Sequence, residues 1–187
     1  MSKTQRDIAV FVGSLRAKSY NRMMAHVLAQ IAPEDLNLEI VEIDDLPMYN
    51  PDLDGDDAPE PWLRLRKRLH QVEGVLFLTP EYNRSIPAVL KNAIDVGSRP
   101  YGDSSWDGKP GAIASLSPGK IGAFGANHHL RQCCVFLNIQ MMQQPEVYLG
   151  GVAEMFDDQG NLIDDSAREF MSTFLQAFQE WVNTHLD

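Results

Sequence analysis

Apolar and polar residues follow two different patterns along the chain. Short segments that are continuously apolar, or that alternate between apolar and polar, predict five strands. Residues 7–13 and 74–79 are apolar almost throughout, which is typical of parallel strands that are covered on both faces. Residues 36–43 alternate between apolar and polar, and residues 111–117 form a weaker apolar run. Residues 145–150 complete the set as a short final strand.

The second pattern places an apolar residue every three or four positions, and it predicts five helices. These helices cover residues 21–32, 62–72, 85–96, 127–138 and 165–186. Ser85 is the candidate N-cap of the third helix, and Pro87 then falls in its first turn, where proline is tolerated.

Strands and helices therefore alternate five times. This alternation predicts an α/β fold with parallel strands, right-handed crossovers and helices on both faces of the sheet. Five such units fit the flavodoxin-like three-layer sandwich, whose five-stranded parallel sheet has the order 2-1-3-4-5. No repeat or linker divides the chain, so we expect residues 1–187 to form a single domain.

Charge and cysteine content narrow the class of protein. The formal net charge is −10, which argues against nucleic acid as a partner. No apolar run approaches the roughly 20 residues of a membrane span, and the N-terminal run is not followed by a signal-peptide cleavage site. Cys133 and Cys134 are adjacent and do not form an ordinary disulfide, so we expect a cytoplasmic protein.

The segment after the first strand is unusually basic for so acidic a chain. Residues 13–22 read GSLRAKSYNR, with three cations and no acid. Ligands of such folds bind at the carboxyl ends of the strands, and the N-terminus of a helix attracts anions. A capped helix start with solvated cations would explain Ser19 and Asn21. It would not explain cations beside a helix N-terminus, which the helix dipole disfavours.

A phosphate group suits this segment. Ser14 and Ser19 can donate hydrogen bonds, Asn21 can donate or cap the helix, and Arg16 offers a forked donor for a dianion. The sequence contains neither G-x-x-x-x-G-K-[ST] nor G-x-G-x-x-G, which are the fingerprints of mononucleotide and dinucleotide loops. The phosphate of FMN, the ligand of flavodoxin-like folds, fits better.

Three ordered motifs carry a family resemblance. GSLRAKSYN, the pair PEYN and LKNAID, and GKPGAIASLSPGKIGAFG followed by LRQ resemble the NADPH-dependent FMN reductase family, and within it the soluble quinone and chromate reductases. The resemblance covers nearly the whole chain. It implies a flavodoxin-like fold that binds FMN, with assembly as a homodimer or homotetramer.

The resemblance also implies which residues contact FMN. The phosphate would be held by Ser14, Arg16, Ser19 and Asn21, the isoalloxazine would be lined by Glu81, Tyr82 and Asn83, largely through backbone groups, and Ser117 and Gly119 would lie along the ring or the ribityl chain. Leu15, Tyr20, Pro80 and Arg84 complete the expected set. The plain alternative for PEYN is a turn followed by a helix cap.

The chain departs from the family pattern at three positions. Arg84 stands where the nearest relatives are expected to have an aromatic residue. Gly125 and His128 replace an Arg and a Tyr that often help assembly or shape the substrate pocket. Subunit contacts and substrate preference are therefore less firmly implied than FMN binding.

The resemblance implies an oxidoreductase. FMN would accept hydride from NADPH or NADH and then reduce a quinone, azo dye, nitroaromatic, free flavin or chromate at the same site in a ping-pong reaction. We name no catalytic side chain, because the flavin carries the chemistry. The alternative is a flavodoxin-type electron carrier without direct NAD(P)H oxidation, for which the acidity of the chain would suit basic redox partners.

Metal sites and phosphoacceptor chemistry are disfavoured. Residues 50–55 mimic the first half of an EF-hand loop, but Pro61 stands where a bidentate Glu is needed. We therefore expect residues 44–61 to form a solvated acidic loop near the active site or a subunit contact. His129 and Cys133 have zinc-like spacing, yet they fall beside a core stripe of Leu130, Cys133, Cys134 and Leu137. The third strand ends in Thr79 and Pro80, without the Asp of a receiver domain.

Overall fold

The apolar run of β1 (Arg6–Val12) supplies side chains to both faces of the sheet. In the computed structural model, which describes residues 5–186, Ile8, Val10 and Val12 pack into one core cluster and Ala9 and Phe11 into the other. Successive side chains of a strand point to opposite faces, so a continuous apolar run is buried on both. β3 (Gly74–Thr79) is likewise buried at every residue.

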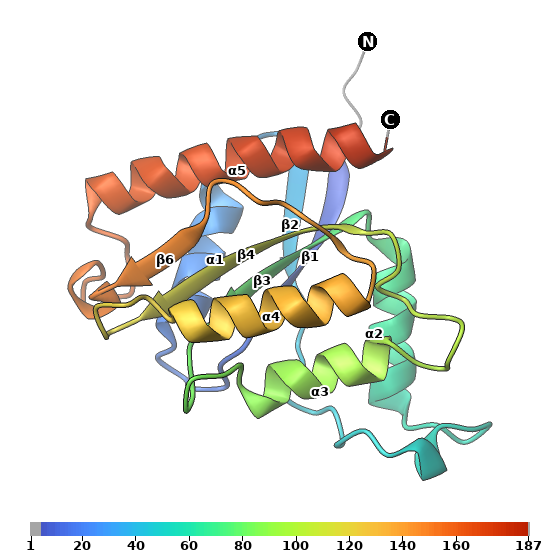
Figure 1. The fold of residues 1–187 in the computed structure, drawn as a ribbon. Helices are drawn as coiled ribbons and strands as arrows, with labels where there is room; N and C mark the ends of the chain where they lie inside the picture. Colours follow the sequence, from blue (N-terminus) through green and yellow to red (C-terminus); the bar gives the residue numbers. More distant parts are fainter. Residues whose placement is uncertain (1–4, 187) are drawn as a thin grey trace.

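The sheet is parallel and has the order β2-β1-β3-β4-β5, which confirms the predicted 2-1-3-4-5 arrangement (Figure 1). β2 spans Leu36–Ile40 and β4 spans Pro110–Ser117. β4 is a central strand, buried along nearly its whole length, rather than the weak strand that its small residues suggested.

The fifth position of the sheet is shared by two short strands, whereas the sequence predicted one strand at 145–150. β5 (Gln140–Met141) pairs with the start of β4, and β6 (Val147–Gly150) pairs with its end. Pro145 lies between them and has no N–H to contribute to a ladder, so pairing is interrupted there.

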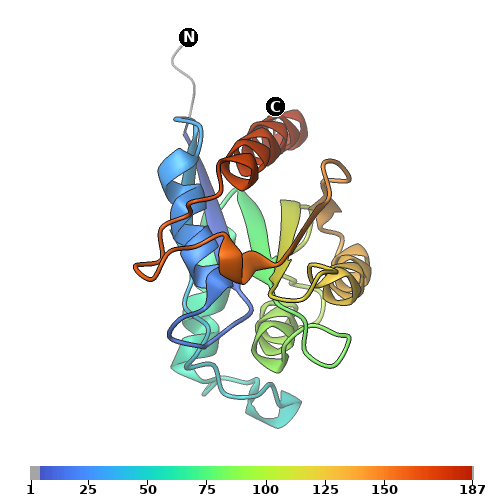
Figure 2. The same cartoon turned by 90° about the vertical axis from the view of Figure 1, so that its left-hand side faces the viewer.

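Helices cover both faces of the sheet (Figures 1 and 2). α1 (Tyr20–Ile31) and α5 (Asp165–Leu186) contribute to one core cluster. α2 (Glu60–Gln71), α3 (Ala88–Gly97) and α4 (Phe124–Phe136) contribute to the other. Two short 3₁₀ turns stand at Pro51–Leu53 and Val152–Glu154. Within residues 5–186, no helix combines the length and the apolar character of a membrane span.

The expectation that Ser85 caps the third helix is wrong. α3 begins at Ala88, its N-cap residue is Pro87, and no side chain caps it. Proline disfavours helical backbone at the residue before it, so the helix begins after Pro87. Ser85 belongs instead to a tight turn, in which its backbone exchanges two hydrogen bonds of 3.0 Å with Tyr82.

The loop at residues 44–61 is tied to the core by a buried ion pair. Nη1 and Nη2 of Arg66 donate to the carboxylate of Asp54 at 2.7 and 2.9 Å, and these side chains are only 10% and 9% exposed. The same guanidinium donates through Nε to the carbonyl of Val96, and the hydroxyl of Tyr49 donates to Asp54. Asp54 is therefore not solvated as expected, and Arg66 does not lie on a solvent face of its helix.

This ion pair makes stability depend on pH. The hydrogen bonds from Arg66 hold the pKa of Asp54 below its usual value. A carboxyl whose folded pKa is lowered stabilises the protein above its unfolded pKa, and that stability is lost as the pH falls through the folded pKa. Below about pH 5, the free energy of unfolding of the native protein should therefore fall more steeply than that of the Asp54→Asn variant.

We expect Arg66→Ala to lower the free energy of unfolding by about 3–5 kcal/mol, because it leaves the Asp54 carboxylate buried without its partner. The matched control is Arg64→Ala, which removes an exposed pair with Asp45 and should cost about 1 kcal/mol or less. Urea unfolding at pH 7 measures both. Equal losses would show that the buried pair does not anchor the loop.

Candidate functional site

Three loops meet at the carboxyl ends of the central strands (Figure 2). They follow β1, β3 and β4, at the edge where the strand order reverses and where such folds bind ligands. The loops enclose a cleft of about 130 Å³. Its lining residues are Ser14, Arg16, Ser19, Tyr20, Asn21, Pro80, Glu81, Tyr82, Leu116, Ser117 and Pro118.

The cleft brings together most of the residues that the sequence singled out. Leu15, Asn83, Arg84 and Gly119 were also expected at the site, but they lie outside its lining. Leu116 and Pro118 line it and were not anticipated. Pro118 could have been found as the neighbour of Ser117, whereas a leucine at the end of an apolar strand gives no sign of such a role.

The first loop presents the N-terminus of α1 to the cleft. Ser19 is the N-cap residue, and its side chain accepts a hydrogen bond of 3.3 Å from the backbone N–H of Arg22. The first turn contains no acidic residue. Ser14 and Ser19 are both buried. The positive end of the helix dipole is therefore left without a carboxylate of its own.

The cations of this loop divide into two kinds. Arg22 forms a two-pronged pair with Glu42, with Nη1 at 2.9 Å from Oε1 and Nη2 in contact with Oε2. Arg16 and Lys18 are exposed, and neither forms an ion pair with any residue in the described range 5–186. The guanidinium of Arg16 lies over the ring of Tyr20, 5.4 Å from its centre. Arg16 lines the cleft, and both cations also line a second hollow together with Asp157 and Asp158.

Asn21 carries a buried oxygen that lacks a partner. Its Nδ2 donates to the carbonyl of Leu116 at 3.4 Å, which ties α1 to the end of β4. Its Oδ1 is buried and accepts no hydrogen bond from the described residues. An unsatisfied buried acceptor costs about 1–3 kcal/mol, and a ligand hydroxyl would remove that cost. A fully ionised phosphate has no proton to offer this oxygen.

The second loop is a strained hairpin. Asn83 and Arg84 have φ values of 51° and 67°, in the left-handed region, between the hydrogen-bonded residues Tyr82 and Ser85. A two-residue hairpin with a type I′ turn needs positive φ at both central positions, and the second position is usually Gly. Arginine in this conformation stores strain, which persists only where the surroundings hold it. The ring of Tyr82 is about half exposed beside the cleft.

The third loop, residues 118–123, lies directly on β6. A Cβ at Gly122, whose φ is +58°, would come within 2.4 Å of the carbonyl carbon of Tyr148. A Cβ at Gly150 would come within 2.3 Å of the carbonyl oxygen of Lys120. At the start of the loop, the hydroxyl of Ser117 accepts a hydrogen bond of 3.0 Å from the backbone of Gly119.

A buried polar network that the sequence analysis missed supports this loop. The hydroxyl of Ser115 contacts the carbonyls of Gly122 at 2.8 Å and Val147 at 3.0 Å, and Nδ2 of Asn127 donates to Ser115 at 3.2 Å. Arg131 in turn donates to Oδ1 of Asn127 at 3.1 Å. A serine within a buried strand and an asparagine on a buried helix face were the available clues.

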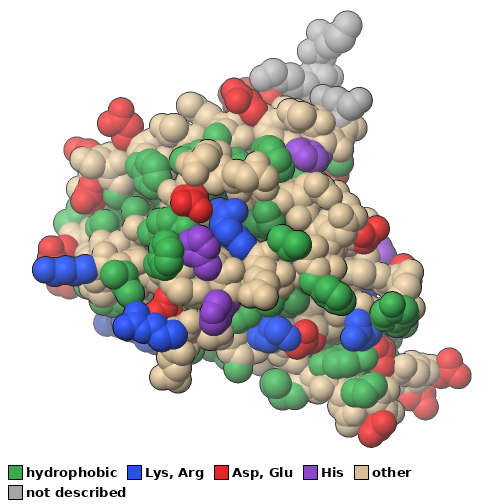
Figure 3. Space-filling model, viewed as in Figure 1, with side chains coloured by type: hydrophobic (Ala, Val, Ile, Leu, Met, Phe, Trp, Pro, Cys, Tyr) green, Lys and Arg blue, Asp and Glu red, His purple; other side chains and the backbone are tan. Residues whose placement is uncertain are grey.

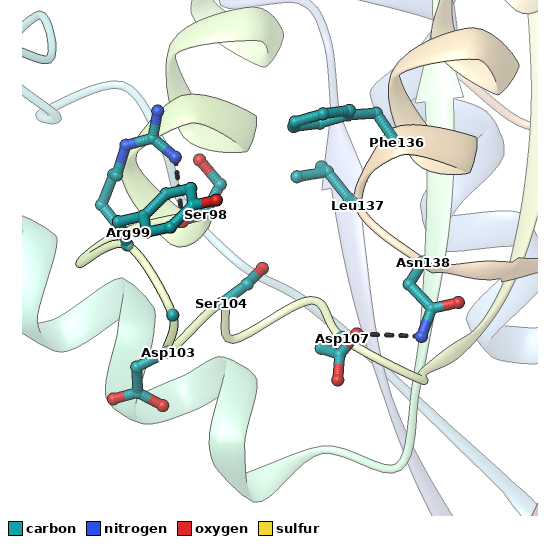
Figure 4. A pocket seen from close by; sticks show the side chains of 10 residues that line it. Ser98, Arg99, Asp103, Ser104, Asp107, Phe136, Leu137 and Asn138 are labelled. Atoms are coloured by element: carbon teal, nitrogen blue, oxygen red, sulfur yellow. Dashed lines mark hydrogen bonds between the residues drawn. The ribbon is translucent and has the colours of Figure 1, made fainter.

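A larger hollow of about 470 Å³ lies at the other end of α4 (Figure 4). It opens between the C-terminal ends of α3 and α4, and Arg99, Tyr101 and Phe136 are among its lining residues. Its lining residues come from the end of α3 with the loop that follows it, and from the end of α4, rather than from a strand carboxyl end or a helix N-terminus. The smaller cleft is therefore the better site for a phosphate-bearing ligand, in spite of its size.

Within residues 5–186, no three His, Cys, Asp or Glu side chains are placed to share a metal ion. Nδ1 of His129 lies 3.0 Å from the hydroxyl of Ser85. Burial raises the pKa of the Cys134 thiol to about 12, so it stays protonated. Cys133 is only partly buried, and therefore does not belong to the core stripe as expected.

A family model and individual proteins of known sequence both match this chain. The family model described as NADPH-dependent FMN reductase matches residues 6–154. A quinone reductase from Pseudomonas putida is 56% identical over 176 residues, covering 94% of each chain. A 2-hydroxy-1,4-benzoquinone reductase from a Burkholderia species is 45% identical and covers 94% of this chain and 95% of its own.

The solved structure of FerB, a flavoenzyme NAD(P)H:(acceptor) oxidoreductase from Paracoccus denitrificans, superimposes with a TM-score of 0.90. It is 43% identical, and the alignment covers 96% of this chain and 98% of FerB. Sequence and structure thus agree over nearly the whole chain, and the three-loop cleft lies within the matched region. This chain belongs to the NADPH-dependent FMN reductase family.

Proposed function

We propose that this protein is a quinone reductase that uses bound FMN and takes its electrons from NADPH or NADH. Family membership supports the cofactor and the donor, and relatives at 56% and 45% identity are named as quinone reductases. When bound, FMN would supply the redox chemistry between the nicotinamide and the acceptor. The side chains of this protein would bind FMN, orient it and shield it from water.

One observation carries the phosphate assignment. Arg16 and Lys18 are exposed and unpaired within residues 5–186, although most other arginines in that range are paired with acids. They stand beside the N-terminus of α1, where Ser19 caps the helix and Ser14 adds a buried hydroxyl. A dianion at this position would satisfy the cations and the helix dipole together.

The buried acceptor of Asn21 suggests a second point of attachment. The side chain was expected to hold the phosphate, but its Nδ2 is already bonded to Leu116 and its free atom is an oxygen. A ribityl hydroxyl of FMN carries the proton that this oxygen needs. We therefore assign Asn21 to the ribityl chain, together with Ser117, which lines the same cleft.

The small size of the cleft bears on substrate range. Pockets that enclose a whole ligand measure roughly 300–1,000 Å³, and this cleft measures about 130 Å³. It suits the phosphate and ribityl end of FMN, which leaves the ring beside the exposed Tyr82. An open ring is accessible to a donor and an acceptor in turn. This favours ping-pong turnover and tolerance of azo, nitroaromatic, chromate and free-flavin acceptors besides quinones.

The function is tested by the visible spectrum of the purified protein during anaerobic addition of NADPH or NADH. Direct bleaching of a bound flavin spectrum is the expected result, because a reductase takes hydride without a second protein. A bound flavin that neither nicotinamide bleaches would instead favour the electron carrier. Absence of flavin after soaking with FMN would contradict the assignment of the cleft.

Arg16→Ala should weaken FMN binding roughly 10-fold to 100-fold, the value of a charge-assisted hydrogen bond, and leave riboflavin binding nearly unchanged. Riboflavin lacks the phosphate, so it reports every effect other than the loss of the anion contact. Arg22→Ala is the matched control, because Arg22 is already paired with Glu42. Titration with quenching of flavin fluorescence measures each affinity, and equal losses for both ligands would rule out the phosphate contact.

We also propose that the protein forms a homodimer through the face of α3 and α4, with a homotetramer as the larger alternative. On this face apolar side chains lie among Lys, Arg and His (Figure 3). Val135 and Phe136 of α4 are 75% and 83% exposed. A groove of about 390 Å³ runs beside them, lined by residues of both helices and the turn before α3. Exposed apolar patches of this kind mark interaction surfaces.

Phe136→Asp should shift the protein from dimer or tetramer to a smaller species, because a carboxylate would be buried in the subunit contact. Leu63→Asp is the control, since it places the same charge at a half-exposed leucine of α2. Sedimentation velocity at micromolar concentration distinguishes the species. An unchanged assembly state of Phe136→Asp would place the contact elsewhere.

The proposed cellular compartment and partners of the protein follow from its cysteines and its charge. Free Cys133 and Cys134 are compatible with a reducing compartment, and we propose the cytoplasm. The proposed partners are small molecules rather than nucleic acid or membrane, in keeping with the net charge of −10.

A further inference from the structure

The N-terminus of α4 lacks a cap of its own. Its N-cap residue is Ala123, which has a φ of 60° and a side chain that cannot accept a hydrogen bond. The first turn contains no acidic residue. The backbone N–H groups at the start of a helix need acceptors, and the helix dipole favours a negative charge beside them. The acceptor must therefore come from another part of the chain.

Glu81 supplies it from the loop after β3. Its Oε2 accepts a hydrogen bond of 3.1 Å from the backbone N–H of Ala126, in the first turn of α4. The side chain of Glu81 is only 11% exposed, although its loop lies at the surface. Its Oε1 is 3.4 Å from Nη1 of the exposed Arg84. The carboxylate thus contacts α4 and Arg84, while Glu81 and Tyr82 also line the cleft.

Gly125 makes room for this contact. A Cβ at this position would lie 2.9 Å from Oε2 of Glu81 and 3.2 Å from the carbonyl oxygen of Arg84. Gly125 lies in α4 and its φ is not positive, so its backbone would accept alanine. Glycine disfavours a helix relative to alanine. Its presence here is explained by the approach of Glu81 rather than by the backbone.

A second contact joins the same two elements. The hydroxyl of Ser85 lies 3.0 Å from Nδ1 of His129, one turn further along α4. Glu81 and Ser85 flank the hairpin at Tyr82–Arg84, so α4 holds the hairpin on both sides. α4 itself begins where the third loop ends. The position of the second loop relative to the third is therefore set through α4.

We propose that Glu81 is a positioning residue that fixes the separation of the second and third loops, and with it the slot that receives the flavin. This role rests on the proposed function, because the slot is defined by FMN. Glu81 acts through its carboxylate on the backbone of α4 and Gly125 provides the space, while the backbone of the loop is left to contact the cofactor.

Glu81→Ala tests the role against its conservative variant. We expect Glu81→Ala to weaken FMN binding roughly fivefold to tenfold, as loss of a helix cap implies. Glu81→Gln keeps an oxygen that can accept from Ala126, and should stay within about twofold of the native affinity. Glu60→Ala, which removes a carboxylate from the first turn of α2, should leave the affinity unchanged. Native affinity in Glu81→Ala would overturn the proposal.

Gly125→Ala provides an independent test through a double-mutant cycle. In the native background, the added methyl group should displace the Glu81 carboxylate and weaken FMN binding about as much as Glu81→Ala does. In the Glu81→Ala background, the same substitution should cost at most about twofold, because the carboxylate is gone. Gly55→Ala, at a site with open space, controls for the glycine change itself. Equal losses in both backgrounds would contradict the link.

Amide hydrogen exchange separates this inference from the proposed function. In flavin-free protein, exchange at Ala126 should be roughly fivefold to tenfold faster in Glu81→Ala than in native protein or Glu81→Gln. Unchanged exchange would overturn the cap whatever FMN does. If exchange changes as expected but native protein binds no FMN, the proposed function and the flavin slot fail, whereas the cap of α4 stands.

Discussion

Burial of both faces of β1 and β3 is the constraint on which the rest of the structure depends. Alternate residues of these strands enter two separate cores, so helices must cover each face, and each strand must be connected to the next by a crossover. All carboxyl ends of the strands then lie along one edge of the sheet. The three loops converge there because the strands are parallel, and not because the loops attract one another.

Some cations of this acidic chain form ion pairs with acids, whereas others do not. The arginines at 22, 64, 66 and 68 are each matched by an acid from another segment, so an acidic chain uses its few cations mainly to fasten loops to helices. Arg16, which lines the cleft, and Lys18, which follows it in the same loop, are exceptions within the described residues. Within the described residues, Lys67, Arg99 and Lys120 also form no ion pair. What distinguishes Arg16 is therefore its position in the cleft beside the N-terminus of α1.

The sequence predicted the order of the strands and many residues of the cleft, since both follow from local patterns. Apolar runs indicate strands, and Ser19 with Arg16 indicates a helix start and a candidate anion site. It did not predict contacts between distant segments. The pair of Asp54 with Arg66, the hydrogen bond from Asn21 to Leu116 and the cap of α4 by Glu81 each join residues that no periodicity relates. For the same reason, the sequence did not predict that β5 and β6 share the fifth position of the sheet, or that Ser85 does not cap α3.

The left-handed conformation of Asn83 and Arg84 has a consequence for binding. A loop held in a rare conformation by its surroundings has given up most of its conformational entropy during folding. Binding a ligand then requires little further ordering, so more of the contact energy appears as affinity. The cost of ordering the hairpin is then borne by the stability of the folded protein.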